Sequence, residues 1–475
     1  MSQQNGFTKQ RRCALRLILR VLALGALAIA YARAVGATTN LAGEVAMSAP
    51  PTVTAVGPTN NSPTITNGVM VGPSSPPFRF SRAEAGLWGT TYPINLFYVS
   101  CGITGSSAFL PYVAEFETDA QELEILTLGA AAQYRLRVNG QYVGLEAAQG
   151  PPADGSFYWL DLAFPDRQRR AIALESFVMP FGGLAIGPQD QLYRPRAPLG
   201  PRCIVLGDSY TEGLLCYAQR LAGLLGWEVW SSGVGGTGYI NPGPTGRVKF
   251  RDRVESDVIA HYPDLVIVAG GLNDGGYPSS ELYSEALALY DTILTNLPSA
   301  KLVVVGPWWP SGIAADYILA ARDTLEEAAS ERNLDFIDPI VATNVQQINV
   351  GWITGAGNVA NPAGDGNADQ YISADGVHPT DLGHQYLAVK MAERLGNITL
   401  TNSTPNISLN ISNLFAGLGL HGMIGRNYLI QTASDLGQSN WVDAATVTLS
   451  SDPQSWVDAS SAVSARRFYR AVLLP

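Results

Sequence analysis

Residues 202–213 read Arg-Cys-Ile-Val-Leu-Gly-Asp-Ser-Tyr-Thr-Glu-Gly, and this stretch decides the fold of the region around it. The apolar residues Cys203 to Leu206 predict a buried parallel strand, and the pattern that follows predicts a helix running to about Leu225. Ser209 lies at the turn between them, at the carboxyl end of the strand, where α/β proteins bind ligands. Ser209 is therefore a candidate nucleophile, although Gly-Asp-Ser could also serve only to cap a helix.

The partners that a serine nucleophile needs are present downstream. A serine hydroxyl is inert near neutral pH unless a base takes its proton, and that base must be oriented by a third group. The loop Asp375-Gly376-Val377-His378 carries a carboxylate and an imidazole three residues apart. We expect His378 to act as the base for Ser209, with Asp375 behind it.

Two glycine-containing segments can supply donors for an oxyanion. The first, Ser231-Ser232-Gly233-Val234-Gly235-Gly236-Thr237-Gly238, follows the strand Glu228-Val229-Trp230. The second, Gly270-Gly271-Leu272-Asn273-Asp274, follows the strand 265–269. Attack on an ester carbonyl creates an oxyanion that hydrogen-bond donors must stabilise. The sequence predicts three such donors, which are the N–H groups of Ser209 and Gly236 and the side-chain amide of Asn273.

In their order and spacing these four blocks resemble the SGNH (GDSL-type) hydrolase superfamily, over residues 200–396. The resemblance implies Ser209 as the nucleophile, Gly236 and Asn273 as oxyanion donors, His378 as general base and acid, and Asp375 as its orienting partner. It also implies a flavodoxin-like three-layer α/β fold and no cofactor. The second block begins with Ser231, where the family usually has Asn.

The alternation of strands and helices over 200–396 predicts a doubly wound parallel sheet. We expect strands at 202–206, 227–230, 264–269, 301–305 and 334–337, and helices near 211–225, 250–261, 279–297, 313–332 and 380–395. Trp308 and Trp309 follow the fourth strand. These indoles either stack on a sugar or acyl group of the substrate or cover the core.

Residues 78–199 contain short alternating strands separated by turns, among them the hairpin turn Asn139-Gly140, which predicts a jelly-roll-like β-sandwich. A sandwich of this kind before an SGNH domain resembles the arrangement in carbohydrate esterase family two, which implies removal of acetyl groups from polysaccharides. Residues 397–475 return to a β pattern, typical of a small C-terminal sandwich with Trp441 and Trp456 as core candidates.

The N-terminus has the character of an export signal. Lys9-Gln10-Arg11-Arg12 precedes the apolar run Val21 to Ala32, so residues 1–37 predict a cleaved signal peptide, with an uncleaved anchor as the alternative. Residues 38–77, rich in Pro, Ser and Thr, predict a flexible linker. No later stretch is long enough to span a membrane. The mature protein is thus expected to be secreted or periplasmic.

The four cysteines offer no spacing suited to a metal, and Cys13 would leave with the signal. Cys203 and Cys216 are expected to be small buried residues. A disulfide involving Cys101 remains open.

A formal net charge of −10 argues against nucleic acid or an anionic membrane as the main partner. The sequence therefore predicts an exported serine esterase, without metal or cofactor, acting on an acylated small molecule or polysaccharide. A short acyl group, acetyl on carbohydrate, is the favoured substrate. The alternatives are an O-acyltransferase that uses the same residues and a non-catalytic carbohydrate-binding surface protein.

Overall fold

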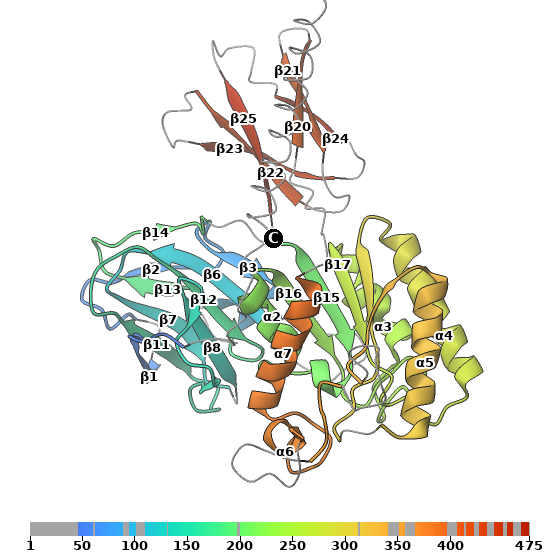
Figure 1. Ribbon diagram of the computed structural model, residues 1–475. Coiled ribbons are helices and arrows are strands. Elements are labelled where there is room, and N and C mark those ends of the chain that lie inside the picture. Colours follow the sequence, from blue (N-terminus) through green and yellow to red (C-terminus); the bar gives the residue numbers. More distant parts are fainter. Residues whose placement is uncertain are drawn as a thin grey trace, which may run out of the picture.

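The protein consists of an N-terminal β-sandwich, a central α/β domain and a small C-terminal β domain (Figure 1). The computed structural model describes residues 46–474, apart from 60–61, 89–94, 101–109, 131, 197–199, 312–313, 341–350, 357–365, 397–405, 413–414, 422–426, 435–440, 450–453 and 459–466. The predicted signal peptide and Cys101 lie outside the described residues.

The α/β domain is built on a five-stranded parallel sheet with the order β16-β15-β17-β18-β19. Its strands are β15 (Arg202–Gly207), β16 (Glu228–Gly233), β17 (Leu265–Ala269), β18 (Lys301–Val305) and β19 (Asp335–Ile337). Its helices are α2 (Tyr217–Leu225), α3 (Phe250–Asp257), α4 (Ser279–Asn296), α5 (Asp316–Glu331), α6 (Ala368–Tyr371) and α7 (Asp381–Leu395), with short 3-10 turns at η1 (Ser209–Thr211) and η2 (Ile259–His261). This is the flavodoxin-like order, as predicted.

Helices cover both faces of the sheet, because alternate residues of each strand point to opposite sides (Figure 1). Cys203, Val205 and Ile267 pack with α2 and α7 on one face. Ile204 and Val266 pack with α3, α4 and α5 on the other. Both faces are buried, which explains the continuous apolar runs in these strands.

The first helix begins later than the sequence predicted. Ser209 lies in the 3-10 turn η1, and α2 starts only at Tyr217, after its cap Cys216. Gly213 between them has φ 96°, a left-handed conformation that a continuous helix does not contain. Ser209 therefore lies in a tight turn that a short loop separates from α2, and it is not in the first turn of a long helix.

The N-terminal unit is a sandwich of two mainly antiparallel sheets, with the orders β1-β11-β7-β13-β2 and β10-β8-β12-β6-β14. The first sheet contains β1 (Thr52–Thr59), β2 (Val69–Val71), β7 (Glu122–Leu128), β11 (Phe157–Ala163) and β13 (Leu184–Ile186). The second contains β6 (Tyr112–Thr118), β8 (Gln133–Val138), β10 (Ala148–Gln149), β12 (Arg170–Ser176) and β14 (Leu192–Tyr193), with β3 (Arg79–Ser81) and β9 (Gln141–Tyr142) attached. Apolar side chains from both sheets fill the space between them.

Part of the expected linker belongs to this sandwich. Residues 38–77 include β1 and β2, and β1 pairs with β11 along most of its length. The run Thr52-Val53-Thr54-Ala55-Val56 is rich in β-branched residues, which favour strands even within a Pro- and Ser-rich segment. Within residues 78–199, which were expected to form the sandwich, β4 (Ala83–Trp88) and β5 (Asn95–Ser100) instead pair with each other in a separate two-stranded sheet.

A buried polar cluster joins the sandwich to the edge strand of the parallel sheet. Ser81 donates to Glu228 at 2.8 Å, and the Trp230 indole N–H donates to Ser81 at 2.7 Å. Arg82 donates to the Ser231 carbonyl at 2.6 Å, while Arg202 forms a bidentate pair with Glu228. Because these groups are buried and bonded to one another, the two domains are fastened at β16.

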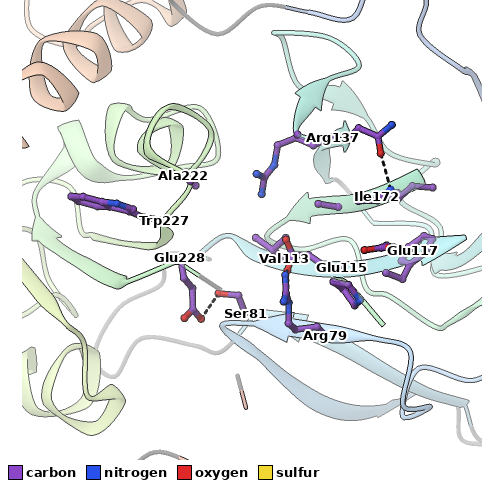
Figure 2. Close-up of a pocket in the computed structure, with 18 of the residues that line it drawn as sticks. Arg79, Ser81, Val113, Glu115, Glu117, Arg137, Ile172, Ala222, Trp227 and Glu228 are labelled. Atoms are coloured by element: carbon purple, nitrogen blue, oxygen red, sulfur yellow. Dashed lines mark hydrogen bonds and ion pairs between the residues drawn. The ribbon is translucent and has the colours of Figure 1, made fainter. Parts of the chain in front are cut away.

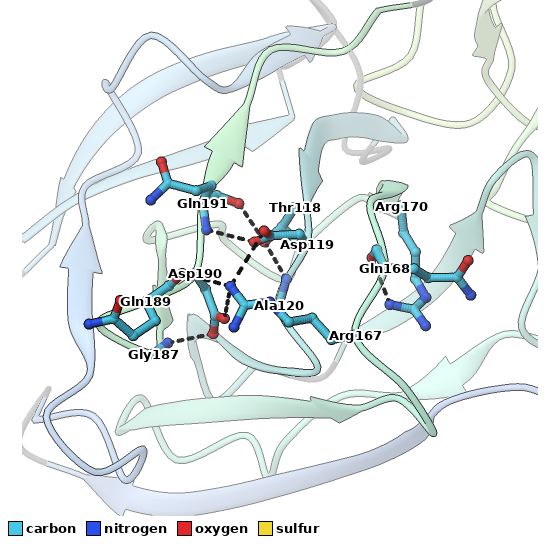
Figure 3. A network of polar contacts seen from close by, with 10 residues as sticks. All are labelled: Thr118, Asp119, Ala120, Arg167, Gln168, Arg170, Gly187, Gln189, Asp190 and Gln191. Atoms are coloured by element: carbon cyan, nitrogen blue, oxygen red, sulfur yellow. Dashed lines mark hydrogen bonds and ion pairs between the residues drawn. The ribbon is translucent and has the colours of Figure 1, made fainter.

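A second polar network joins two connecting segments of the sandwich (Figure 3). Arg167 pairs with Asp190 at 2.9 Å and with Asp119 at 3.4 Å. Asp119 also accepts from the Gln191 N–H at 2.7 Å, and Thr118 donates to the Gln191 carbonyl at 2.9 Å. The network fixes the turn after β6 against the segment between β13 and β14.

The C-terminal domain has two three-stranded sheets, β20-β21-β24 and β23-β22-β25. Its strands are β20 (Asn406–Ser412), β21 (Phe415–His421), β22 (Asn427–Ala433), β23 (Val442–Thr448), β24 (Gln454–Asp458) and β25 (Phe468–Leu473). Leu420 and Tyr428, one from each sheet, meet in its core. The expected core residues Trp441 and Trp456 are only half-buried, and Trp441 instead lies under the Arg470 guanidinium.

Cys203 and Cys216 are both buried, as expected, and neither forms a disulfide. Among the described residues, none of the helices is both long enough and apolar enough to cross a bilayer.

Candidate active site

Ser209 lies just beyond the end of β15, next to the point where the strand order of the sheet reverses. β15 is flanked by β16 on one side and β17 on the other, and such switch points open a crevice at the carboxyl edge. Asp208 caps the turn by accepting the Tyr210 N–H at 3.0 Å. A Cβ at Gly207 would lie 2.2 Å from Thr211 Oγ1, so only glycine permits so tight a turn.

The structure brings Ser209, His378 and Asp375 into one chain of hydrogen bonds. His378 Nε2 is 3.0 Å from Ser209 Oγ, and His378 Nδ1 is 2.7 Å from Asp375 Oδ2. With Nδ1–H donated to the carboxylate, Nε2 carries the lone pair that can accept a proton from the serine hydroxyl. These distances are those of a nucleophile, a base and its orienting group.

Several bonds hold the His378 loop in this position. Asp375 Oδ1 accepts the N–H groups of Val377 and His378 at 2.8 and 2.9 Å and the Ser373 hydroxyl at 2.7 Å. The Tyr210 hydroxyl donates to the Val377 carbonyl. Tyr210 therefore ties the turn that carries the serine directly to the loop that carries the histidine, a role that the sequence did not reveal.

Gly236 and Asn273 lie at the neighbouring loops. A Cβ at Gly235, the residue before Gly236, would come within 3.5 Å of Ser209 Cβ, and Gly236 itself has φ 74°. Asn273 Nδ2 donates to the Thr237 carbonyl at 2.9 Å and lies 3.5 Å from Asp208 Oδ2. The amide of Asn273 is thus oriented between the glycine-rich turn and the serine turn.

Three charged residues that the sequence did not single out support the glycine-rich turn. The Asp274 carboxylate accepts the N–H groups of residues 239, 240 and 241 at 2.9, 2.9 and 3.0 Å. Glu212 accepts the Gly235 N–H at 2.9 Å, and Arg247 donates to the Gly235 carbonyl. Their positions in the sequence, next to Asn273 and soon after Ser209, are the signal that could have identified Asp274 and Glu212.

The two aspartates beside the reacting groups have opposite electrostatic environments. Burial raises the pKa of Asp208 to about 7, although its bond from the Tyr210 N–H opposes this shift. The hydrogen bond from His378, with those from the Val377 N–H and the Ser373 hydroxyl, holds the pKa of Asp375 far below its usual range. Asp375 therefore stays ionised and can stabilise a positively charged imidazole.

The two indoles after β18 are not equivalent. Trp308 is 2% exposed and packs parallel to Tyr210, with the ring centroids 5.6 Å apart. It is a core residue beneath the serine turn, so the expectation that it stacks on substrate is replaced by the core-covering interpretation. Trp309 is half-buried and meets Tyr317 edge-on at 6.3 Å.

His384 faces the interior and does not join the reacting residues. Its Nδ1 accepts the Tyr217 N–H at 3.3 Å, and burial lowers its pKa to about 3. It is a neutral structural residue.

A three-layer α/β fold with Ser209, His378 and Asp375 joined at the carboxyl edge of its sheet, beside Asn273, defines a hydrolase of the SGNH type. The model of the GDSL-like lipase/acylhydrolase family matches residues 205–386. The GDSL lipase Rv0518 of Mycobacterium tuberculosis is 31% identical over 211 residues, which are 40% of this chain and 78% of that protein. The chain belongs to this family.

Solved structures with a similar arrangement include two family two carbohydrate esterases. The one from Cellvibrio japonicus is 13% identical, with a TM-score of 0.49 over 69% of this chain and 97% of that one. The one from Clostridium thermocellum, in complex with cellohexaose, is 14% identical, with a TM-score of 0.47 over 67% and 98%. The salicylyl-acyltransferase SsfX3 is 12% identical, with a TM-score of 0.48 over 70% and 99%. At these scores the likeness assigns no function to this chain.

Proposed function

We propose that the protein is an exported serine esterase that hydrolyses short acyl esters, acetyl esters on carbohydrate above all, through Ser209, His378 and Asp375. The observation that carries this proposal is the unbroken chain of contacts of 3.0 and 2.7 Å from the Ser209 hydroxyl to the Asp375 carboxylate. Membership of an acylhydrolase family supports the reaction class.

In the proposed mechanism, Ser209 Oγ attacks the ester carbonyl while His378 Nε2 takes its proton. Asp375 stabilises the imidazolium that forms, and the N–H groups of Ser209 and Gly236 with the amide of Asn273 bind the oxyanion. His378 then gives the proton to the leaving alcohol, which departs and leaves the acyl group on Ser209. Water, deprotonated by His378, hydrolyses this acyl-enzyme.

The openness of the site supports a short acyl group on a large alcohol. The side chains of His378 and Asp375 are 46% and 50% exposed, and residues 374–378 are all exposed. A bulky polymer can approach groups that stand at the surface in this way. A long alkyl chain gains about 0.8 kcal/mol for each CH₂ that is buried, which requires enclosing walls. An acetyl group needs no such burial.

Replacement of the nucleophile tests the reaction. Ser209→Ala should lower kcat for p-nitrophenyl acetate by a factor of roughly 10³ or more, because the covalent route is removed. Ser284→Ala, which changes an exposed serine on α4, is the matched control and should retain full activity. A Ser209→Ala enzyme with undiminished turnover, or a wild-type enzyme that no serine-directed phosphonate labels, would contradict the proposal.

The substrate and destination have separate tests. Acetate release from acetylated xylan, mannan and pectin should exceed release of longer acyl groups from matched esters. Mass spectrometry of the protein recovered outside the cytoplasm should find an N-terminus near residue 38, since residues 1–37 predict a cleaved signal.

Two alternatives use the same chain differently. An O-acyltransferase would pass the acyl group from Ser209 to another hydroxyl and would release little acetate until an acceptor is added. A carbohydrate-binding protein without catalysis would bind polysaccharide but release no acetate at all. The His378 side chain is 46% exposed, so water can approach it from solvent, which supports hydrolysis as the first candidate.

A further inference from the structure

A groove of about 440 Å³ lies between the sandwich and the α/β domain (Figure 2). One wall is formed by β3, β6, β8 and β12 of the sandwich. The other wall is formed by the end of α2 and the start of β16. Its volume lies within the range of roughly 300–1,000 Å³ that is usual for ligand pockets.

The groove is remote from the reacting serine. β15 and β16 run in parallel, with Arg202 beside Glu228 at one end and Gly207 beside Gly233 at the other. Ser209 follows the second end, whereas Glu228 and Val229 at the first end line the groove. Five residues of strand span about 17 Å at a rise of about 3.3 Å per residue. The groove is thus at the opposite edge of the sheet from the esterase site.

Charges are abundant in the groove but are balanced. Glu115 pairs with Arg79 at 2.6 Å, and Arg137 pairs with Glu175 at 2.7 Å. Glu228 is held by Arg202. A groove with neutralised charges has no net field to attract an anion or a metal cation. It still offers many hydrogen-bonding atoms, because a guanidinium has five N–H groups and a carboxylate has two acceptor oxygens.

Apolar surface alternates with these polar groups. Val113, Ala173, Ala222 and Val229 form the buried floor of the groove. The exposed Ala171 and the half-buried Pro195 and Trp227 are its more accessible apolar residues. In Figure 2 the Arg137 side chain extends from β8 into the space between the domains. A pyranose ring presents the matching surface, since it carries apolar C–H faces edged by neutral hydroxyl groups.

We propose that this interdomain groove binds a short segment of a neutral oligosaccharide and tethers the enzyme to its polymeric substrate. The choice of a saccharide, and not another neutral polyol, rests on the proposed function. Binding here involves no acyl chemistry and leaves the Ser209 site accessible to an ester elsewhere on the same polymer.

Calorimetric titration of the full-length Ser209→Ala protein with unsubstituted cellohexaose, xylohexaose and mannohexaose tests this proposal. At least one hexaose should bind, and Trp227→Ala in the same background should raise its Kd tenfold or more. Ala171→Leu should also weaken binding, because Ala171 is an exposed groove residue on β12 and a larger side chain there fills space without entering the core. Circular dichroism checks that each variant is folded.

Trp441→Ala is the matched control, since Trp441 is a half-buried indole in the C-terminal domain, and it should leave Kd unchanged. Absence of binding by all three hexaoses would overturn the proposal. So would binding that Ala171→Leu leaves unaltered, because the sugar would then occupy another site. The outcome is separate from that of the proposed function: groove-dependent binding without acetate release would refute the esterase alone, and acetate release without groove-dependent binding would refute the tether alone.

Discussion

Replacement of Asp274 by asparagine should damage both the stability and the turnover of the enzyme. Asp274 is 1% exposed, and its carboxylate accepts three backbone N–H groups from residues 239–241, directly after the glycine-rich segment. Oδ1 accepts from Ile240 and Asn241, and Oδ2 accepts from Tyr239. In Asp274→Asn one oxygen becomes an NH₂ group, so at least one buried N–H faces another donor.

The expected magnitude follows from this count. In the least harmful orientation of the new asparagine side chain, the amide oxygen still accepts the N–H groups of Ile240 and Asn241. Only the Tyr239 N–H then loses its acceptor. An unsatisfied buried donor costs about 1–3 kcal/mol, and the two remaining bonds weaken because their acceptor is no longer charged. We therefore expect the free energy of unfolding to fall by about 3 kcal/mol. Loss of one whole oxyanion donor costs about 10²- to 10³-fold in kcat, so a displaced Gly236 N–H should cost about 10- to 100-fold.

Urea unfolding and steady-state kinetics on p-nitrophenyl acetate measure the two effects. KM should change little, because the oxyanion donors act mainly on the transition state. Asp335→Asn is the control, since Asp335 is an exposed carboxylate paired with Lys301 and should contribute under about 1 kcal/mol. An Asp274→Asn enzyme with the stability and kcat of the wild type would refute the role assigned to this carboxylate.

Three further predictions follow from the same region. Because burial raises the pKa of Asp208 to about 7, the native chain retains a proton that the unfolded chain releases above about pH 4, so stability should fall as pH rises from about 4 to 7. Asp208→Asn should remove this slope, as measured by urea midpoints at several pH values. Tyr210→Phe deletes the bond to the Val377 carbonyl and should lower the free energy of unfolding by about 1 kcal/mol and reduce kcat more than it raises KM; an unchanged kcat would show that the His378 loop is held by other contacts. Trp308→Ala should cost about 3–5 kcal/mol in urea unfolding, since the indole is buried in the core, and stability equal to wild type would contradict that placement.

The parallel sheet could be predicted because its strands are buried on both faces. Cys203 to Leu206 and Leu265 to Ala269 are unbroken apolar runs, each followed by glycine, and such runs have few alternatives in a soluble domain. The start of α2 was not predictable from periodicity, because the left-handed φ of Gly213 depends on how the turn meets the neighbouring strands. β1 was not predicted, because the Pro- and Ser-rich composition of residues 38–77 indicated a linker and the run of Thr and Val within it is short.

The residues of the site that carry a family pattern could be predicted, whereas those that support them could not. Ser209, Asn273 and His378 each follow a strand or stand in a short recognisable block. The residues that hold the site in place contact partners that are distant in the sequence. For example, the Tyr210 hydroxyl donates to the Val377 carbonyl, 167 residues away. The sequence also could not show which of the two adjacent indoles, Trp308 or Trp309, is buried, because burial depends on how the fold packs around them.

The contacts of Ser81 and Arg82 with β16 bear on how the catalytic domain can be handled in isolation. β16 is an edge strand of the parallel sheet, and Arg82 donates a hydrogen bond to the Ser231 carbonyl of this strand. An open strand margin is a template for pairing with other chains. A truncated protein that begins near residue 200 would lose this cover, and it should self-associate in solution even though every group needed for ester cleavage is still present.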